Sequence, residues 1–164
     1  LKAESGQPLD AARILWELFV EARHGGDHQW ECITMVHMGM VYRTLRWGIA
    51  VKLLEMSIAL AEEINFTLAK VMALDRLGEM KCSWGQFEES LTMFEEALSL
   101  ADSSDLALRR TILLNMVIAY EGLDQLRRCI SILEEILRID DRIDHEDRAE
   151  DREHLERIHR SLGG

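Results

Sequence analysis

Proline is almost missing from this sequence, which holds only Pro8 among its 164 residues. Because proline interrupts helix interiors and central strands, its scarcity permits long regular elements. Alternating β-branched runs, the pattern of half-buried strands, are also lacking. A hydrophobic content of 48% with 30% charged residues indicates a folded chain. These features predict an all-α protein, and the length predicts a single domain.

Positive charge is in deficit, since 19 Lys and Arg face 30 Asp and Glu, for a formal net charge of −11. The phosphates of nucleic acids and of anionic membranes would repel such a chain. The longest apolar runs, such as residues 112–114, are also far too short to cross a bilayer. We therefore expect neither nucleic acid nor membrane as partner, and a basic or neutral protein segment as the easier one.

Cysteine is sparse, with three residues, Cys32, Cys82 and Cys129, and no CxxC motif. This odd, scattered set predicts reduced thiols in a cytoplasmic protein. The first residues show no signal-peptide pattern. The sequence does not begin with methionine, so we expect it to be a fragment of a longer protein.

Catalytic motifs are missing as well: there is no phosphate-binding glycine loop, no GxSxG and no HExxH. His24 and His28 are four residues apart, but Gly25 and Gly26 interrupt the helix that would align them for a metal. Paired glutamates recur at the repeat interval, as in 95–96 and 134–135, which is typical of a solvated face. We expect no enzyme activity, no metal and no cofactor.

What is present is a helical repeat, clearest over residues 77–101. Two amphipathic segments flank a turn at Trp84-Gly85, with apolar or small residues at three- and four-residue spacing. The segment resembles a tetratricopeptide (TPR) repeat, which has Leu-Gly on its first helix and Ala…Phe…Ala-Leu on its second. The matching positions here are Leu77, Gly78, Ser90, Phe94, Ala97 and Leu98.

The repeat interval is 39 residues, from Gly39 to Gly78 and again to Val117. The common TPR repeat has about 34 residues, so these helices should be about one turn longer. In this the chain resembles the extended repeats of Pins-type polarity adaptors, kinesin light chains and bacterial peptide-sensing regulators. Val117 in place of glycine predicts that the third hairpin is slightly splayed.

The resemblance implies a right-handed α-α superhelix over residues 1–164. We predict a half-repeat over 8–24, repeats over 27–64, 67–102 and 105–139, and a capping helix over 144–162. Turns are expected at 46–48 and 123–124, with Asp27 as a helix N-cap. The charged stretch after Ile139 keeps a narrow apolar stripe at helical spacing, which favours the capping helix over a disordered tail.

The resemblance also implies a function, the binding of a partner's peptide in a concave groove lined by the first helices. An acidic middle at Asp75 and Glu79 predicts an amphipathic ligand with basic residues. Asn115 is the sharpest candidate, because an amide can both donate to and accept from a peptide main chain. The candidate groove residues are Ile33, Val36, Met40, Arg43, Met72, Asp75, Arg76, Glu79, Cys82, Leu114, Asn115, Ile118 and Glu121.

Plainer interpretations stay open for these residues. The apolar ones, such as Ile33, Leu114 and Ile118, fit ordinary helix packing equally well. The charged ones fit a solvated face. A carboxylate clamp of the kind found in chaperone-tail receptors is excluded, because Val36 and Met40 occupy the places that it needs.

Two alternative functions remain at this point. One is a peptide-sensing regulatory domain of a bacterial signalling or transcription regulator. The other is self-association into a homodimer through the helix over residues 9–20, which is apolar nearly all round. Its candidate contact residues are Leu15, Trp16 and Phe19.

Overall fold

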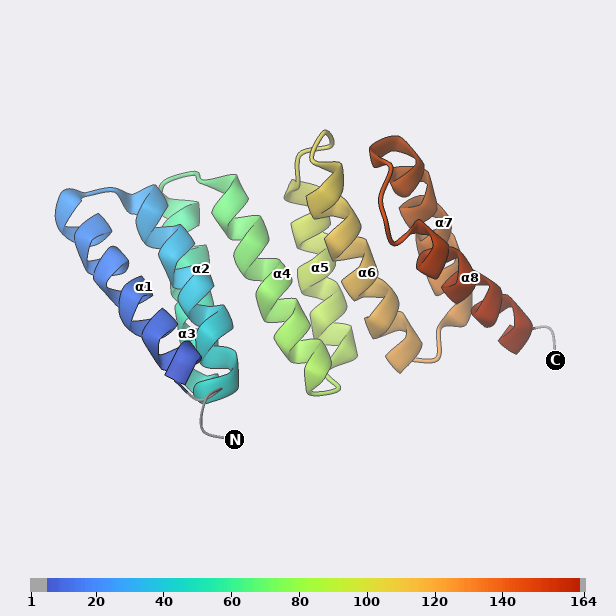
Figure 1. Ribbon diagram of the computed structural model, residues 1–164, viewed down its shortest axis with the longest axis horizontal. Helices are drawn as coiled ribbons and strands as arrows, with labels where there is room; N and C mark the ends of the chain where they lie inside the picture. Colours follow the sequence, from blue (N-terminus) through green and yellow to red (C-terminus); the bar gives the residue numbers. More distant parts are fainter. Residues whose placement is uncertain (1–5, 163–164) are drawn as a thin grey trace. The chain divides into compact units, whose positions relative to one another are not determined.

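The computed structural model describes residues 6–162, and over that range it holds eight helices and no strand (Figure 1). The predicted all-α fold is therefore confirmed. The ends of the predicted domain, residues 1–5 and 163–164, lie outside the described residues.

The helices follow one another in the order expected of helix hairpins after a leading single helix. They are α1 (Gly6–Gly25), α2 (His28–Leu45), α3 (Trp47–Glu63), α4 (Thr67–Ser83), α5 (Phe87–Leu100), α6 (Leu106–Gly122), α7 (Leu126–Ile143) and α8 (Arg148–Leu162). The chain divides into two compact units, Leu1–Leu77 and Gly78–Gly164, which are described separately. The single domain of the sequence analysis stays a prediction.

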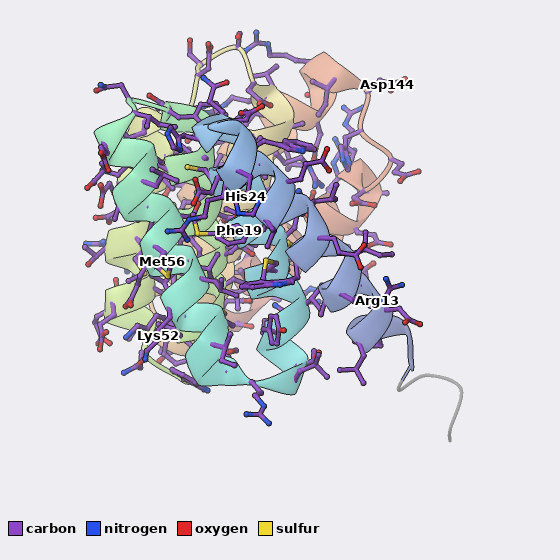
Figure 2. All side chains as sticks on the ribbon, turned by 90° about the vertical axis from the view of Figure 1, so that its left-hand side faces the viewer. Arg13, Phe19, His24, Lys52, Met56 and Asp144 are labelled. Carbon is purple, nitrogen blue, oxygen red and sulfur yellow. The ribbon has the colours of Figure 1, made fainter. Side chains whose placement is uncertain are left out.

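In the first unit, α1 packs on α2 and α2 packs on α3. Phe19 joins Met35 and Met38 in a buried cluster. Figure 2 shows Phe19 in the middle of the first unit and Arg13 nearer the N-terminal end of α1. A second cluster of small residues, Cys32, Ala61 and Ala69, lets α2, α3 and the start of α4 approach closely. These contacts bury the apolar face that the helical spacing predicts.

Local signals in the sequence set where helices begin and end. The Asp27 carboxylate accepts a hydrogen bond from the Trp30 amide at 3.0 Å, which confirms the predicted N-cap. Asp105 caps α6 in the same way, accepting from the Leu108 amide at 3.0 Å. Gly85 (φ 74°) and Asp124 (φ 56°) adopt the left-handed conformation that turns the chain between helices.

The predicted turn at 46–48 is wrong, because only Arg46 separates α2 from α3. Trp47 and Gly48 already belong to α3. In the first turn of a helix the amides have no intrahelical acceptor, so poor helix formers are tolerated there. The end of α7 also differs, since the helix continues four residues beyond 139 and stops at Asp144 (φ 51°).

Glycine marks the closest helix contact within a hairpin. A Cβ atom placed on Gly39 would lie 2.9 Å from Leu54 Cγ, and one on Gly78 would lie 2.6 Å from Phe94 Cε1. Real Cβ contacts of this length do not occur, so only glycine permits these approaches. In the third hairpin, Val117 and Leu133 occupy the same register positions, and both are buried.

Candidate functional site

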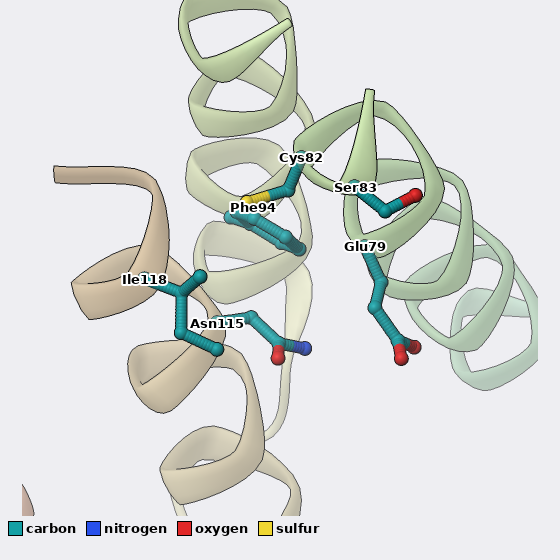
Figure 3. A pocket seen from close by; sticks show the side chains of 6 residues that line it. All are labelled: Glu79, Cys82, Ser83, Phe94, Asn115 and Ile118. Carbon is teal, nitrogen blue, oxygen red and sulfur yellow. The ribbon is translucent and has the colours of Figure 1, made fainter. Parts of the chain in front are cut away.

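The second unit contains a pocket of about 190 Å³ between the last turns of α4, the middle of α5 and the face of α6 (Figure 3). Its lining is mostly apolar. Four of the predicted groove residues, Glu79, Cys82, Asn115 and Ile118, meet in it. The full set of lining residues is Glu79, Cys82, Ser83, Phe94, Asn115 and Ile118.

Helical spacing brings these side chains together. Glu79 and Cys82 are three residues apart on α4, and Asn115 and Ile118 are three apart on α6, so each pair shares one helix face. Phe94 closes the pocket from α5 and is fully buried. Its ring is held there because Gly78 leaves room for it.

The two walls differ in chemistry. Figure 3 shows the carboxylate of Glu79 on the α4 side and the amide of Asn115 on the α6 side. Both side chains also take part in polar interactions within the protein. Ile118 is 54% exposed, so its apolar side chain is accessible from solvent. The arrangement can hold an apolar group while offering a carboxylate and an amide to polar groups beside it.

Cys82 contributes surface rather than reactivity. Burial raises the pKa of its thiol, and the nearby Glu79 carboxylate raises it further, while a hydrogen bond with Ser90 lowers it. A thiol with a raised pKa stays protonated at neutral pH and is a poor nucleophile. Cys82 therefore adds a small apolar patch to the wall.

The other predicted groove residues have varied surroundings. In the first unit Met40 and Arg43 are exposed, and Ile33, Met72 and Arg76 are partly exposed. Val36 and Asp75 are buried, so neither side chain is exposed to a ligand. In the second unit Leu114 is partly exposed, and the Glu121 carboxylate lies 2.8 Å from His154 Nε2 of α8.

The predicted self-association residues also have different surroundings. Phe19 belongs to the core of the first unit, and Leu15 packs against that core. Trp16 stacks on Phe19, with ring centroids 5.4 Å apart, and is 54% exposed. The residues at the same register position in α3, α5 and α7 are Leu54, Phe94 and Leu133, and all three are fully buried. Trp16 is exposed because α1 has no hairpin partner on that side among the described residues.

Two residues of the pocket are not predicted as site residues by the sequence. Phe94 belongs to the repeat pattern, and the structure shows that it also forms a pocket wall. Ser83 lies at the last position of α4, next to the predicted turn, where spacing carries little information. Within the described residues, no cluster of three or more His, Cys, Asp or Glu is arranged to bind a metal. No helix among those residues combines the length and hydrophobicity that a membrane span requires.

Helix hairpins at a constant interval define the class of helical-repeat proteins, and similar solved structures specify it further. No family model matches the chain, and no curated protein matches its sequence. The chain is similar in structure to the nearly identical TPR-like repeats of a protein described as a kinesin light chain from Podosopora anserina. That match has a TM-score of 0.74 at 18% identity and covers 98% of this chain and 81% of the other.

Two further structures support the same fold. A second structure of the Podosopora anserina repeats, which carries one substitution, matches with a TM-score of 0.75 at the same identity and coverage. A double mutant of MamA RS-1 matches with a TM-score of 0.59 at 20% identity, covering 97% of this chain and 89% of the other. The chain therefore has the TPR-like helical-repeat fold.

Proposed function

We propose that this chain is a non-enzymatic, cytoplasmic scaffold that binds a peptide segment of a partner protein. The observation that supports this proposal is the pocket of the second unit, in which four of the predicted groove residues meet. The TPR-like fold supports it, because folds of this kind generally mediate protein–protein interactions.

The pocket suits one apolar side chain of the ligand. Phe94, Cys82 and Ile118 supply apolar surface, and burying a side chain of the size of leucine contributes about 1.5–3 kcal/mol. The Asn115 amide can exchange its polar interactions for hydrogen bonds with a peptide main chain. The Glu79 carboxylate favours a basic residue beside the apolar one. The proposed ligand is thus an amphipathic segment with basic residues.

Replacing Ile118 by glutamate should weaken peptide binding at least tenfold, because a charge would then lie at the mouth of an apolar pocket. Peptides would be selected from a displayed library of amphipathic basic sequences, and the affinity of the best binder measured by fluorescence anisotropy. Met56→Glu on α3 is the matched control, since Met56 is 50% exposed and lies outside the pocket. Equal affinity of Ile118→Glu and the wild-type protein, with unchanged circular dichroism, would remove the pocket from the binding site.

A second candidate function, self-association through α1, is favoured by the exposed ring of Trp16. If the exposed stripe on α1 pairs with a second copy, Trp16→Glu should convert a dimer into a monomer in light scattering. Trp30→Glu is the control, because Trp30 is 47% exposed on α2 of the same unit. A wild-type protein that is monomeric at high concentration, or a dimer that survives Trp16→Glu, would contradict this function.

A further inference from the structure

A buried cluster of charges joins α6, α7 and α8 in the second unit. Arg110 Nε of α6 donates to Asp140 Oδ1 of α7 at 2.6 Å, and Arg110 Nη2 donates to Asp151 Oδ2 of α8 at 2.5 Å. Arg110 and Asp140 are buried, and only 10% of the Asp151 side chain is exposed. The cluster therefore connects the terminal helix to the hairpin beneath it.

The cluster occupies repeat positions that are apolar one interval earlier. At the repeat interval, Arg110 corresponds to Val71 and Asp140 corresponds to Ala101, and both of those residues are buried. The third repeat thus has two charged side chains at positions where the second has two apolar ones. The carboxylate of Asp151 accepts a second hydrogen bond from the guanidinium, which links α8 to α6.

The charges of the cluster do not balance when every carboxyl group is ionised. One guanidinium faces Asp140 and Asp151, and the half-exposed Asp147 carboxylate lies 3.7 Å from Arg110 Nη2. Asp140 Oδ2 is buried and accepts no hydrogen bond from the described residues. An uncompensated buried carboxylate is costly, and a proton between two neighbouring carboxyl groups removes one charge and satisfies the acceptor.

We propose that Asp140 and Asp151 share one proton when α8 is docked, and that this proton acts as a latch on α8. Asp151 Oδ2 accepts from Arg110, and its other oxygen carries the proton and donates to Asp140 Oδ2. Protonation strengthens the docking of α8, and loss of the proton weakens it. It is independent of the peptide-binding function proposed above.

The direction of the pH dependence follows from the surroundings of Asp151. Burial raises the pKa of the Asp151 carboxyl; Arg110 opposes this, and the neighbouring Asp140 carboxylate raises it further. A carboxyl group with a raised pKa in the docked state binds its proton more tightly there than in the undocked state. Docking is therefore strongest below the ordinary aspartate pKa and weakens as pH rises through the raised one, by up to about tenfold per pH unit for one proton.

Other ionisable groups lie near Asp140 and Asp151. Their effects on the docking of α8 must be distinguished from the effect of the shared proton. On the connection between α7 and α8, His145 Nδ1 lies 3.8 Å from Asp147 Oδ2. At the start of α8, Arg148 pairs with Asp141 of α7 at 2.5 Å. Farther along α8, His154 pairs with Glu121 of α6. Both histidines contact carboxylates near the cluster, so variants of these contacts serve as controls.

The test uses the full chain and compares the wild-type protein with Asp151→Asn. Asparagine reproduces the protonated state permanently, because its carbonyl oxygen can accept from Arg110 while its amide donates to Asp140. The measurement is the hydrogen-exchange protection of the α8 amides between pH 5 and pH 8, corrected for the intrinsic exchange rate. We expect protection to fall as pH rises in the wild-type protein and to stay high and constant in Asp151→Asn.

Variants of the neighbouring contacts serve as controls for the shared proton. His154→Gln and Asp147→Asn should keep the pH dependence of the wild-type protein. If Asp151→Asn protects α8 less than the wild-type protein at every pH, or if the wild-type α8 loosens on acidification, the carboxylates are fully ionised and the latch is refuted. Carboxyl-carbon NMR of ¹³C-labelled aspartate gives a second readout without any substitution at residue 151. A pair that shows no shared titration above the ordinary aspartate range would also refute it.

Discussion

Replacing Arg110 by methionine should lower the free energy of unfolding of the second unit by about 3–5 kcal/mol at pH 7, because the buried carboxyl groups of Asp140 and Asp151 then lose their counter-ion. The loss should shrink as pH falls, since protonation removes the charge that the substitution leaves uncompensated. Urea unfolding followed by circular dichroism measures the effect. Arg138→Met is the control, because Arg138 is exposed and its contact with Glu134 spans 3.8 Å at the surface.

A combined variant distinguishes lost charge pairing from lost packing. Arg110→Val together with Asp140→Ala introduces the apolar residues that the second repeat has at these positions, and Asp151→Ala removes the remaining carboxylate. This triple variant should recover most of the stability lost in Arg110→Met, since apolar replacement of a whole buried ion cluster is often neutral. If Arg110→Met alone lowers the free energy of unfolding by less than about 1 kcal/mol, the cluster is solvated.

Replacing Gly78 by alanine should destabilise the second unit by about 1–3 kcal/mol, the usual effect of overpacking a tight contact. The new Cβ atom would lie 2.6 Å from the fully buried ring of Phe94, so the ring would have to be displaced from its packed position. Thermal and urea unfolding both report this loss. The same displacement of Phe94 should alter the pocket, because the ring is one of its walls.

Gly48→Ala is the matched control for that substitution. Nothing lies within 4 Å of a Cβ atom at Gly48 in α3, so alanine should be neutral or stabilise by about 0.5–1 kcal/mol. Gly78→Val with Phe94→Leu reproduces the Val117 and Leu133 pair of the third hairpin and should recover much of the stability. Equal effects of Gly78→Ala and Gly48→Ala would show that the contact with Phe94 is looser than described.

Much of the architecture can be predicted from the sequence because the repeat ties several signals to one register. Gly39 and Gly78 share the position at which a second helix makes its closest approach, and Asp27 occupies an N-cap. Each signal is local, and the constant interval makes each one support the others. The prediction of a helix in the charged terminal stretch is confirmed, because an apolar stripe persists through it.

The binding surface is harder to predict, because groove and core residues share the same helix. Asp75 and Glu79 are four residues apart on α4, yet Asp75 is buried and Glu79 borders the pocket. Helical spacing alone cannot rank two positions on neighbouring parts of one face. The ion cluster escapes prediction for a different reason, since it joins Arg110 to Asp151 across 41 residues of sequence. A charged residue at a repeat position that is apolar elsewhere is the available signal.

The single-residue connection at Arg46 bears on how the chain can be engineered. Gly39 and Leu54 are one residue closer in sequence than Gly78 and Phe94 or Val117 and Leu133. The hairpins of residues 67–102 and 105–139 have the same spacing between their two contact positions. We therefore expect that one can replace the other without rotating its second helix relative to its first. A chimera that grafts α3 behind α4 would need one added residue at the joint; without it, every side chain of the grafted helix would be rotated by about 100°.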